Sequence, residues 1–280
     1  MQRLRAVLAF VVFVVVQTVV GDGLGWLIFR KMQWVEMAWQ PWPFMVIEGI
    51  GFGAAIVASL AAGATQRKRL RDYGFAAGGA LRHLLAGSAW GLGAVALVIG
   101  AIAAFGGFTV HGFHLHGTTL LGYAAGWLAA MFVLGASEEA TFRATGMFTL
   151  GDAMGIWPAA VVTTLIFSAL HYFGKPNESV ADALSVGLLG FFMAFTIVRT
   201  GSIWWAVGFH ALFDYAALVL AGAPNTGYEG GQPLSTRLLE TRFHGAEWLT
   251  GGVTGIEASW LIFPVIAILF LGFARVYRSR

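Results

Sequence analysis

Residues 118–148 read TTLLGYAAGWLAAMFVLGASEEATFRATGMF, and this stretch decides the fold. The part from 118 to 137 carries no charge, and about 20 largely apolar residues let a helix cross the hydrocarbon core of a bilayer. Glu138, Glu139 and Arg143 follow before the run becomes apolar again. A charge near the bilayer centre costs at least about 2.5 kcal/mol on insertion scales, so these three residues indicate a functional site inside a membrane helix.

The composition of the whole chain indicates the same compartment. Of 280 residues, 58% are hydrophobic and 11% charged, with a mean hydropathy of +0.74. Soluble domains are about 45–50% apolar and about 25% charged, so this chain cannot cover a soluble surface. The 11 Trp, 23 Phe and 38 Gly fit the aromatic belts and close helix contacts of a membrane bundle.

Cysteine is absent, which excludes disulfides, thiolate metal sites and a cysteine nucleophile. Any chemistry must therefore come from carboxylates, imidazoles, hydroxyls or the backbone. The net charge of +3 is explained by basic loops of a membrane protein, so no nucleic-acid partner is expected.

Hydropathy predicts an all-α fold, a polytopic membrane bundle of about eight transmembrane helices in a single domain, 1–280. The connections 66–83 and 222–255 are expected as loops, the first with a short interfacial helix, and Glu48 is expected at the membrane interface. The predicted spans are 6–29, 43–65, 84–108, 118–148, 157–173, 182–199, 202–221 and 256–275.

Basic residues are distributed unequally between the two sides of this bundle. Cytoplasmic loops carry an excess of Lys and Arg, so both termini are predicted to be cytoplasmic in a multi-pass protein of the cell membrane, with the lipid bilayer as its surroundings. The side with the termini holds Arg3, Arg5, Arg67, Lys68, Arg69, Arg71, Arg82, Arg199, Arg275, Arg278 and Arg280, and the other side holds Arg30, Lys31, Lys175, Arg237 and Arg242.

The ionisable residues within the spans form pairs at helical spacing. Glu139 and Arg143 are i and i+4 and can pair on one face, while Glu138 lies about 100° away and stays available for proton transfer. His210 and Asp214 are also i and i+4, so the carboxylate can orient the imidazole.

Glu138, His171 and His210 are predicted to lie at one depth in the bilayer. With turns near Gly151–Gly155 and at Gly201, they stand about 20, 24 and 14 Å along their helices from those turns. One carboxylate and two imidazoles in a dry pocket can deprotonate a water and stabilise an oxyanion, as peptide hydrolysis requires.

These motifs resemble the CPBP group of intramembrane proteases, which includes the type II CAAX prenyl endopeptidases and the bacterial Abi proteins. The group's pattern is Glu-Glu-x3-Arg, Phe-x3-His and His-x3-Asn or Asp, matched here by three motifs within the expected core helices 118–221. The motif residues are Glu138, Glu139 and Arg143, then Phe167 and His171, then His210 and Asp214.

The resemblance implies a glutamate-dependent endopeptidase without a cofactor, acting on a peptide or protein substrate that is prenylated or lipophilic in some members. It makes Glu138 the general base, His171 its assistant and His210 with residue 214 the oxyanion site, and Phe167 is a candidate substrate contact. Prenyl-processing members carry Asn where this chain has Asp214, and an ionised Asp cannot donate to an oxyanion. Asp214 is therefore expected to orient His210 or to be protonated.

Three alternatives stay open at the level of sequence. Buried acids and bases also make proton relays, as in a proton-coupled transporter. The bundle could instead serve without chemistry, as an immunity or scaffold protein. The third alternative is a peptidase that holds a divalent metal on Glu138, His171 and His210. Separately, the loop histidines have spacing that suits a metal; they are His111, His114 and His116.

Overall fold

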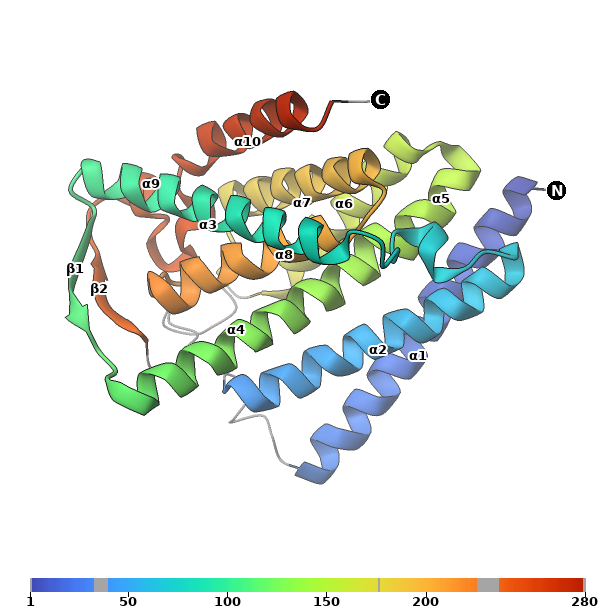
Figure 1. Ribbon diagram of the computed structural model, residues 1–280, viewed down its shortest axis with the longest axis horizontal. Coiled ribbons are helices and arrows are strands. Elements are labelled where there is room, and N and C mark those ends of the chain that lie inside the picture. The colour runs from blue at the N-terminus through green and yellow to red at the C-terminus, as the bar shows by residue number, and fades with distance from the viewer. Residues whose placement is uncertain (1, 33–39, 176, 226–236, 279–280) are drawn as a thin grey trace.

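A computed structural model describes residues 2–32, 40–175, 177–225 and 237–278. Helices dominate it, and a two-stranded ribbon closes one end of the bundle (Figure 1). The helices are α1 (Gln2–Met32), α2 (Pro41–Gln66), α3 (Ala80–Ala104), α4 (Gly117–Glu139), α5 (Gly146–Met154), α6 (Ile156–Gly174), α7 (Val180–Thr200), α8 (Trp204–Asp214), α9 (Glu247–Thr250) and α10 (Ile262–Val276), and the strands are β1 (Phe108–Phe113) and β2 (Leu239–Phe243).

The predicted all-α membrane bundle is confirmed. Within the described residues six helical segments are long and apolar enough to cross a membrane, and two shorter apolar ones cover Trp204–Leu220 and Ile262–Val276. Each of the eight predicted spans coincides with one of these segments. The last begins at Ile262 rather than at 256, because short turns at Gly252–Thr254 and Ile256–Ala258 precede it.

Glycines in the left-handed region set two of the turns that fix the depth of the site. Gly155 has φ +97° between α5 and α6, and Gly201 has φ +68° where α7 ends. A residue without Cβ adopts these angles without steric cost. The turns predicted from the sequence at Gly151–Gly155 and Gly201 are therefore where the chain reverses.

The fourth predicted span is not one continuous helix. Between α4 and α5 the chain forms a π-helical turn over Ala140–Thr145, and Ala144 leaves helical geometry with φ −88° and ψ −110°. An inserted residue of this kind changes which face the following side chains occupy, and π-bulges occur often at functional sites. Here the turn contains Arg143 and lies directly after Glu138 and Glu139.

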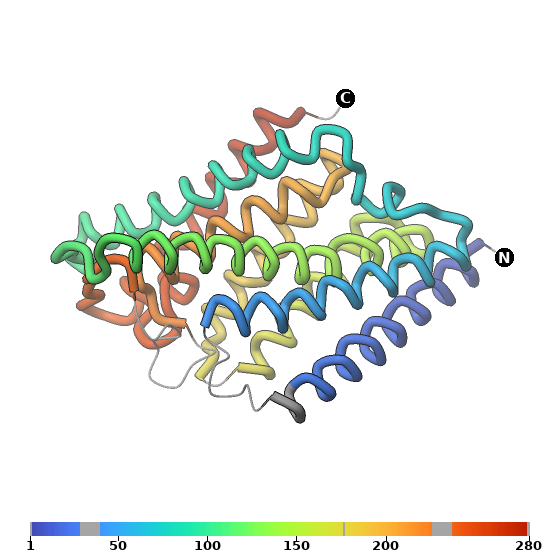
Figure 2. Tube along the Cα trace, turned by 60° about the horizontal axis from the view of Figure 1, so that its bottom comes forward, coloured from blue at the N-terminus to red at the C-terminus, as the bar shows by residue number. Residues whose placement is uncertain are grey.

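Helix α2 lies between α1 and α4, and α8 packs against both α3 and α4 (Figure 2). Glycine allows α3 and α8 to approach closely, since a Cβ on Gly91 would lie 2.3 Å from the carbonyl oxygen of Phe209 and one on Gly208 would lie 2.1 Å from that of Leu84. Close approach at small residues is the usual way for membrane helices to pack. This packing holds α8, which carries His210 and Asp214, in the middle of the bundle.

The connections differ from simple loops in two places. As expected, 66–83 contains one short helix, a 3-10 turn at Leu70–Tyr73. The predicted loop 222–255 instead supplies β2, which pairs antiparallel with β1 from the connection between α3 and α4. The ribbon was not predicted, because each strand is short and its partner is far away in the sequence.

Candidate active site

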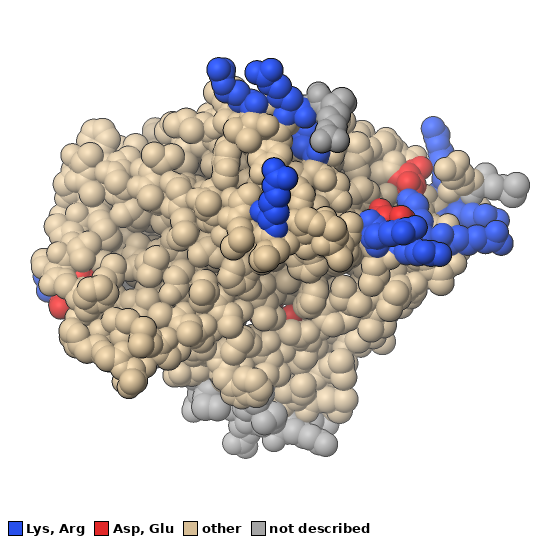
Figure 3. All heavy atoms as spheres, viewed as in Figure 1, with Lys and Arg blue, Asp and Glu red and all other residues tan. Residues whose placement is uncertain are grey.

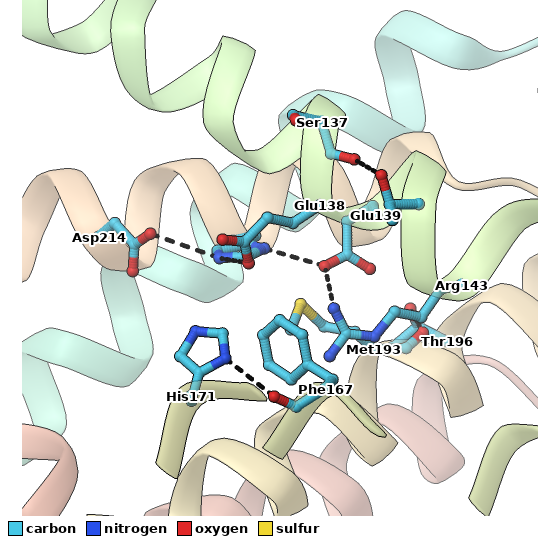
Figure 4. A network of polar contacts seen from close by, with 11 residues as sticks. Ser137, Glu138, Glu139, Arg143, Phe167, His171, Met193, Thr196 and Asp214 are labelled. Carbon is cyan, nitrogen blue, oxygen red and sulfur yellow. Dashed lines mark hydrogen bonds and ion pairs between the residues drawn. The ribbon is translucent and has the colours of Figure 1, made fainter. Parts of the chain in front are cut away.

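The C-terminal end of α4 and the π-helical turn after it hold a buried ion pair. Arg143 donates from Nη1 to Oε1 of Glu139 at 3.0 Å, and both side chains are 0% exposed (Figure 4). The adjacent Glu138 keeps 24% of its side chain exposed. The two neighbouring carboxylates therefore have different environments, one neutralised within the protein and one accessible.

Phe167 links this pair to α6. The guanidinium carbon of Arg143 lies 3.8 Å from the centre of the Phe167 ring, a cation–π contact. On its other side the Phe167 ring is 4.2 Å from the His171 ring, centre to centre. Phe167 thus connects the ion pair to one of the two motif histidines.

His210 on α8 lies among three carboxylates. Its Nδ1 is 2.9 Å from Oε1 of Glu139, and its Nε2 is 3.6 Å from Oε2 of Glu138 and 3.4 Å from Oδ2 of Asp214. Both ring nitrogens thus face acceptors, and the ring can donate on both sides only as the imidazolium. The i and i+4 contact expected for His210 and Asp214 is present, while Glu139 is an orienting partner that the sequence did not indicate.

His171 on α6 is held by its own helix. With a proton on Nδ1 it donates to the carbonyl oxygen of Phe167 at 3.0 Å. Assigned in this way, the tautomer leaves the lone pair of Nε2 available as an acceptor. His171 is therefore placed to accept a hydrogen bond in the space that it faces.

A cavity of about 320 Å³ brings the three motifs together. Its wall includes Glu138, Phe167, His171, His210 and Asp214, whereas Glu139 and Arg143 lie behind it. Oε2 of Glu138 is buried and accepts no hydrogen bond from the described residues. Three segments far apart in the sequence thus place one accessible carboxylate and two imidazoles around one space.

The cavity also has polar residues that the motifs did not indicate. Glu48 on α2 lines it and makes a side-chain hydrogen bond with Ser137, a place in the site that the prediction of an interfacial Glu48 did not include. The sequence places Glu48 at the start of a span, and only the contact between α2 and α4 brings it to Glu138.

Lys175, which follows α6, and Glu257, in the short turn Ile256–Ala258, also line the cavity. Burial raises the pKa of Glu257 from 4.5 to about 7, with Asp214 adding to the rise and Lys175 opposing it. Burial lowers the pKa of Lys175, but attraction to Glu257, Glu178 and Asp182 outweighs it, so the pKa is raised above its ordinary value. Ionisable side chains therefore stand beside the apolar ones in the cavity wall.

The arrangement of possible metal ligands bears on the metal-dependent alternative. In the described part of the chain no three His, Asp or Glu side chains are arranged to hold a metal ion, either at this cavity or among the loop histidines. His210 contacts carboxylates through both ring nitrogens.

Comparison with known proteins adds one finding. Residues 120–216 match the family model described as type II CAAX prenyl endopeptidase Rce1-like. This segment is Rce1-like. Over these residues the match agrees with the family resemblance drawn from the motifs, and the family that it describes is one of proteases.

The Rce1-like segment runs from α4 to the turn after α8 and contains all three motifs. The first three helices and α10 lie outside it. No curated protein and no solved structure matches the chain.

Proposed function

We propose that the chain is an intramembrane endopeptidase in which Glu138 activates a water molecule to hydrolyse a peptide bond. The observation that carries this proposal is the accessible Glu138 carboxylate, with one buried oxygen that accepts no hydrogen bond from the described residues, in a cavity shared with two imidazoles. A general base needs an acceptor within hydrogen-bond reach of the proton it removes.

The chemistry uses a water between Glu138 and Nε2 of His171. Glu138 takes one proton from this water, and the oxygen attacks the carbonyl carbon of the scissile bond. The resulting oxyanion accepts a hydrogen bond from the Nε2–H of His210. Hydrogen bonds to the oxyanion are usually the largest single contribution to transition-state stabilisation in acyl transfer. When the carbon–nitrogen bond breaks, Glu138 returns the proton to the leaving amine.

The buried residues position these groups. Glu139, fixed by Arg143, accepts from Nδ1 of His210 and so sets the direction of Nε2. Asp214, where prenyl-processing members of the family have Asn, balances the charge of the imidazolium at 3.4 Å and donates nothing itself. In this account Glu139, Arg143 and Asp214 are positioning residues.

The substrate is a peptide or protein, and the cavity wall suits both lipidated and unmodified apolar segments. Apolar side chains make up much of the cavity wall, among them Phe44, Met131, Leu134, Val186 and Leu189, and they suit an apolar residue or a prenyl chain equally. Paired peptides with and without a farnesyl group on cysteine would separate these two cases.

The proposal is tested with purified protein and a peptide library, with the cleaved bonds identified by mass spectrometry. Glu138→Gln is expected to lower turnover at least ~1,000-fold, because it removes the base and keeps the shape. Asp152→Asn is the matched control, since Asp152 is an exposed carboxylate that pairs with Lys68 away from the cavity. Turnover by Glu138→Gln equal to that of Asp152→Asn would contradict the proposal.

A further inference from the structure

A second cavity lies between α1 and α2, next to the catalytic one. Its volume is about 540 Å³, and its wall on α1 runs from Gln17 to Trp26, which at 1.5 Å per residue is about 14 Å of helix. The two helices spread apart along this length, towards the last turn of α1 (Figure 1 and Figure 2). We call this cavity the α1–α2 groove.

The groove carries polar side chains between otherwise apolar helices. Gln17, Thr18 and Asp22 line it from α1, and Glu48 lines it from α2. Over α2 and α4 the surface of the molecule carries almost no charged side chain (Figure 3). The ion pairs among the described residues include neither Asp22 nor Glu48. A carboxylate within a membrane span needs a counter-charge or a water-filled cavity, so water in the groove is the solvation that remains for Asp22.

Gln17 lies where the groove meets the π-helical turn, and it has one unused acceptor. Its Nε2 donates to the carbonyl oxygen of Gly51 at 3.4 Å and to Oγ1 of Thr141 at 3.3 Å. Its Oε1 is buried and accepts no hydrogen bond from the described residues. A buried acceptor without a partner is costly, and a water in the groove removes that cost. Because Thr141 belongs to the turn that follows Glu138 and Glu139, this part of the groove adjoins the catalytic segment.

Glu48 belongs to both cavities. It lines the α1–α2 groove and also the catalytic cavity that contains Glu138. Its side chain makes a hydrogen bond with Ser137, the residue before Glu138. The Glu48 side chain therefore stands between two spaces that each contain a buried oxygen without a partner among the described residues, Oε1 of Gln17 and Oε2 of Glu138.

We propose that the α1–α2 groove holds water and that Glu48 passes this water to the catalytic cavity. The role in turnover rests on the proposed function: each hydrolysed peptide bond consumes one water, and the space beside Glu138 must be refilled before the next. One proton of that water goes through Glu138 to the leaving amine, and the other stays on the new carboxyl group. A carboxylate accepts hydrogen bonds from water on both of its sides, which an apolar side chain cannot do. Glu48 thus guides the supply of water and takes no part in bond breaking.

Water in the groove is tested by thiol labelling, because the chain has no cysteine of its own. Thr18→Cys places a thiol in the groove, and Val19→Cys is the matched control one residue along α1, at a side chain that is 66% exposed and lies outside the groove. In lipid nanodiscs, a charged thiosulfonate reagent should modify Thr18→Cys at least ~10-fold faster, since the reactive thiolate forms in water and not among lipid chains. Equal rates would mean that the groove holds lipid chains and would overturn the proposal. Asp22→Cys replaces Thr18→Cys if that variant does not accumulate.

The supply of water to the active site is tested with the same protein before and after modification. A bulky charged thiosulfonate on Thr18→Cys should remove most of kcat for a cleaved peptide and leave KM unchanged, because it fills the groove and not the catalytic cavity. An unchanged kcat after complete modification would overturn the route.

The role of Glu48 is tested by two substitutions at that position. Glu48→Leu should also lower kcat at an unchanged KM, and Glu48→Gln should keep most of it, since an amide still makes hydrogen bonds with water. Equal kcat values for these two variants would overturn the role of Glu48. Labelling needs no turnover, so full activity of Glu138→Gln would contradict the proposed function and leave the labelling result standing.

Discussion

Glu139 and Arg143 form an ion pair from which water is excluded, and such a pair is far more sensitive to the loss of one partner than to the loss of both. Removing one member leaves a buried charge without its counter-ion, whereas replacing both leaves no charge to solvate. The same Glu139 oxygen also accepts from Nδ1 of His210, so in the proposed mechanism the pair orients the imidazole as well as stabilising the fold.

Arg143→Met should therefore lower the free energy of unfolding by about 3–5 kcal/mol. The double variant Glu139→Gln with Arg143→Met should recover much of this loss, as measured by denaturant titration in detergent micelles. Arg71→Met serves as the control, because Arg71 is exposed and its Nε lies 3.8 Å from Oδ1 of Asp72. This substitution should change the free energy of unfolding by less than about 1 kcal/mol. If the double variant loses as much free energy of unfolding as the sum of the two single variants, the account is contradicted.

Glu257 gives the stability of the molecule a pH dependence. Its pKa is raised by burial from 4.5 to about 7, so between these values the folded state binds more protons than the unfolded state. Stability from this group is complete below about pH 4.5 and is lost as pH rises through about 7. The melting temperature in detergent should fall over this window, and Glu257→Gln should flatten the fall. An equal fall in both proteins would show that another group is responsible.

At the level of elements, the contact between α3 and α8 determines where His210 stands. Gly91 and Gly93 are on the same helix, but a Cβ on Gly91 would lie 2.3 Å from the Phe209 carbonyl oxygen, and one on Gly93 would meet no atom within 4 Å. Two substitutions of the same kind thus separate helix packing from helix propensity.

Gly91→Ala should destabilise the protein by about 1–3 kcal/mol and reduce turnover, because α8 must move away together with its histidine. Gly93→Ala should be neutral or should stabilise by up to about 1 kcal/mol, since alanine favours helix over glycine. Thermal unfolding and peptide turnover of both variants check this. Equal behaviour of the two would indicate that the approach of α3 to α8 does not position the site.

The helices and the motif pairs could be predicted from the sequence, because hydropathy and i, i+4 spacing are local properties. Glu139 with Arg143 and His210 with Asp214 lie in contact as that spacing indicates. The ribbon and the cavity positions of Lys175 and Glu257 could not, since they depend on which loops meet in three dimensions. The π-helical turn at Ala140–Thr145 also has no local signal, as nothing in ATFRAT breaks a helix.

For the whole molecule, the bundle encloses a cavity of about 320 Å³ whose wall includes Glu138, His171 and His210. In the proposed mechanism this space holds a water and a peptide bond, and fixed charges act there more strongly than in bulk water. The central claim is that water, activated by Glu138, is the nucleophile in this space.

The most direct measurement is cleavage of an identified peptide in water enriched in oxygen-18, with wild type and Glu138→Gln compared by mass spectrometry. The account predicts one heavy oxygen in the new carboxyl terminus of the wild-type product and no product above background with Glu138→Gln. Labelled product that forms at the wild-type rate with Glu138→Gln would contradict it.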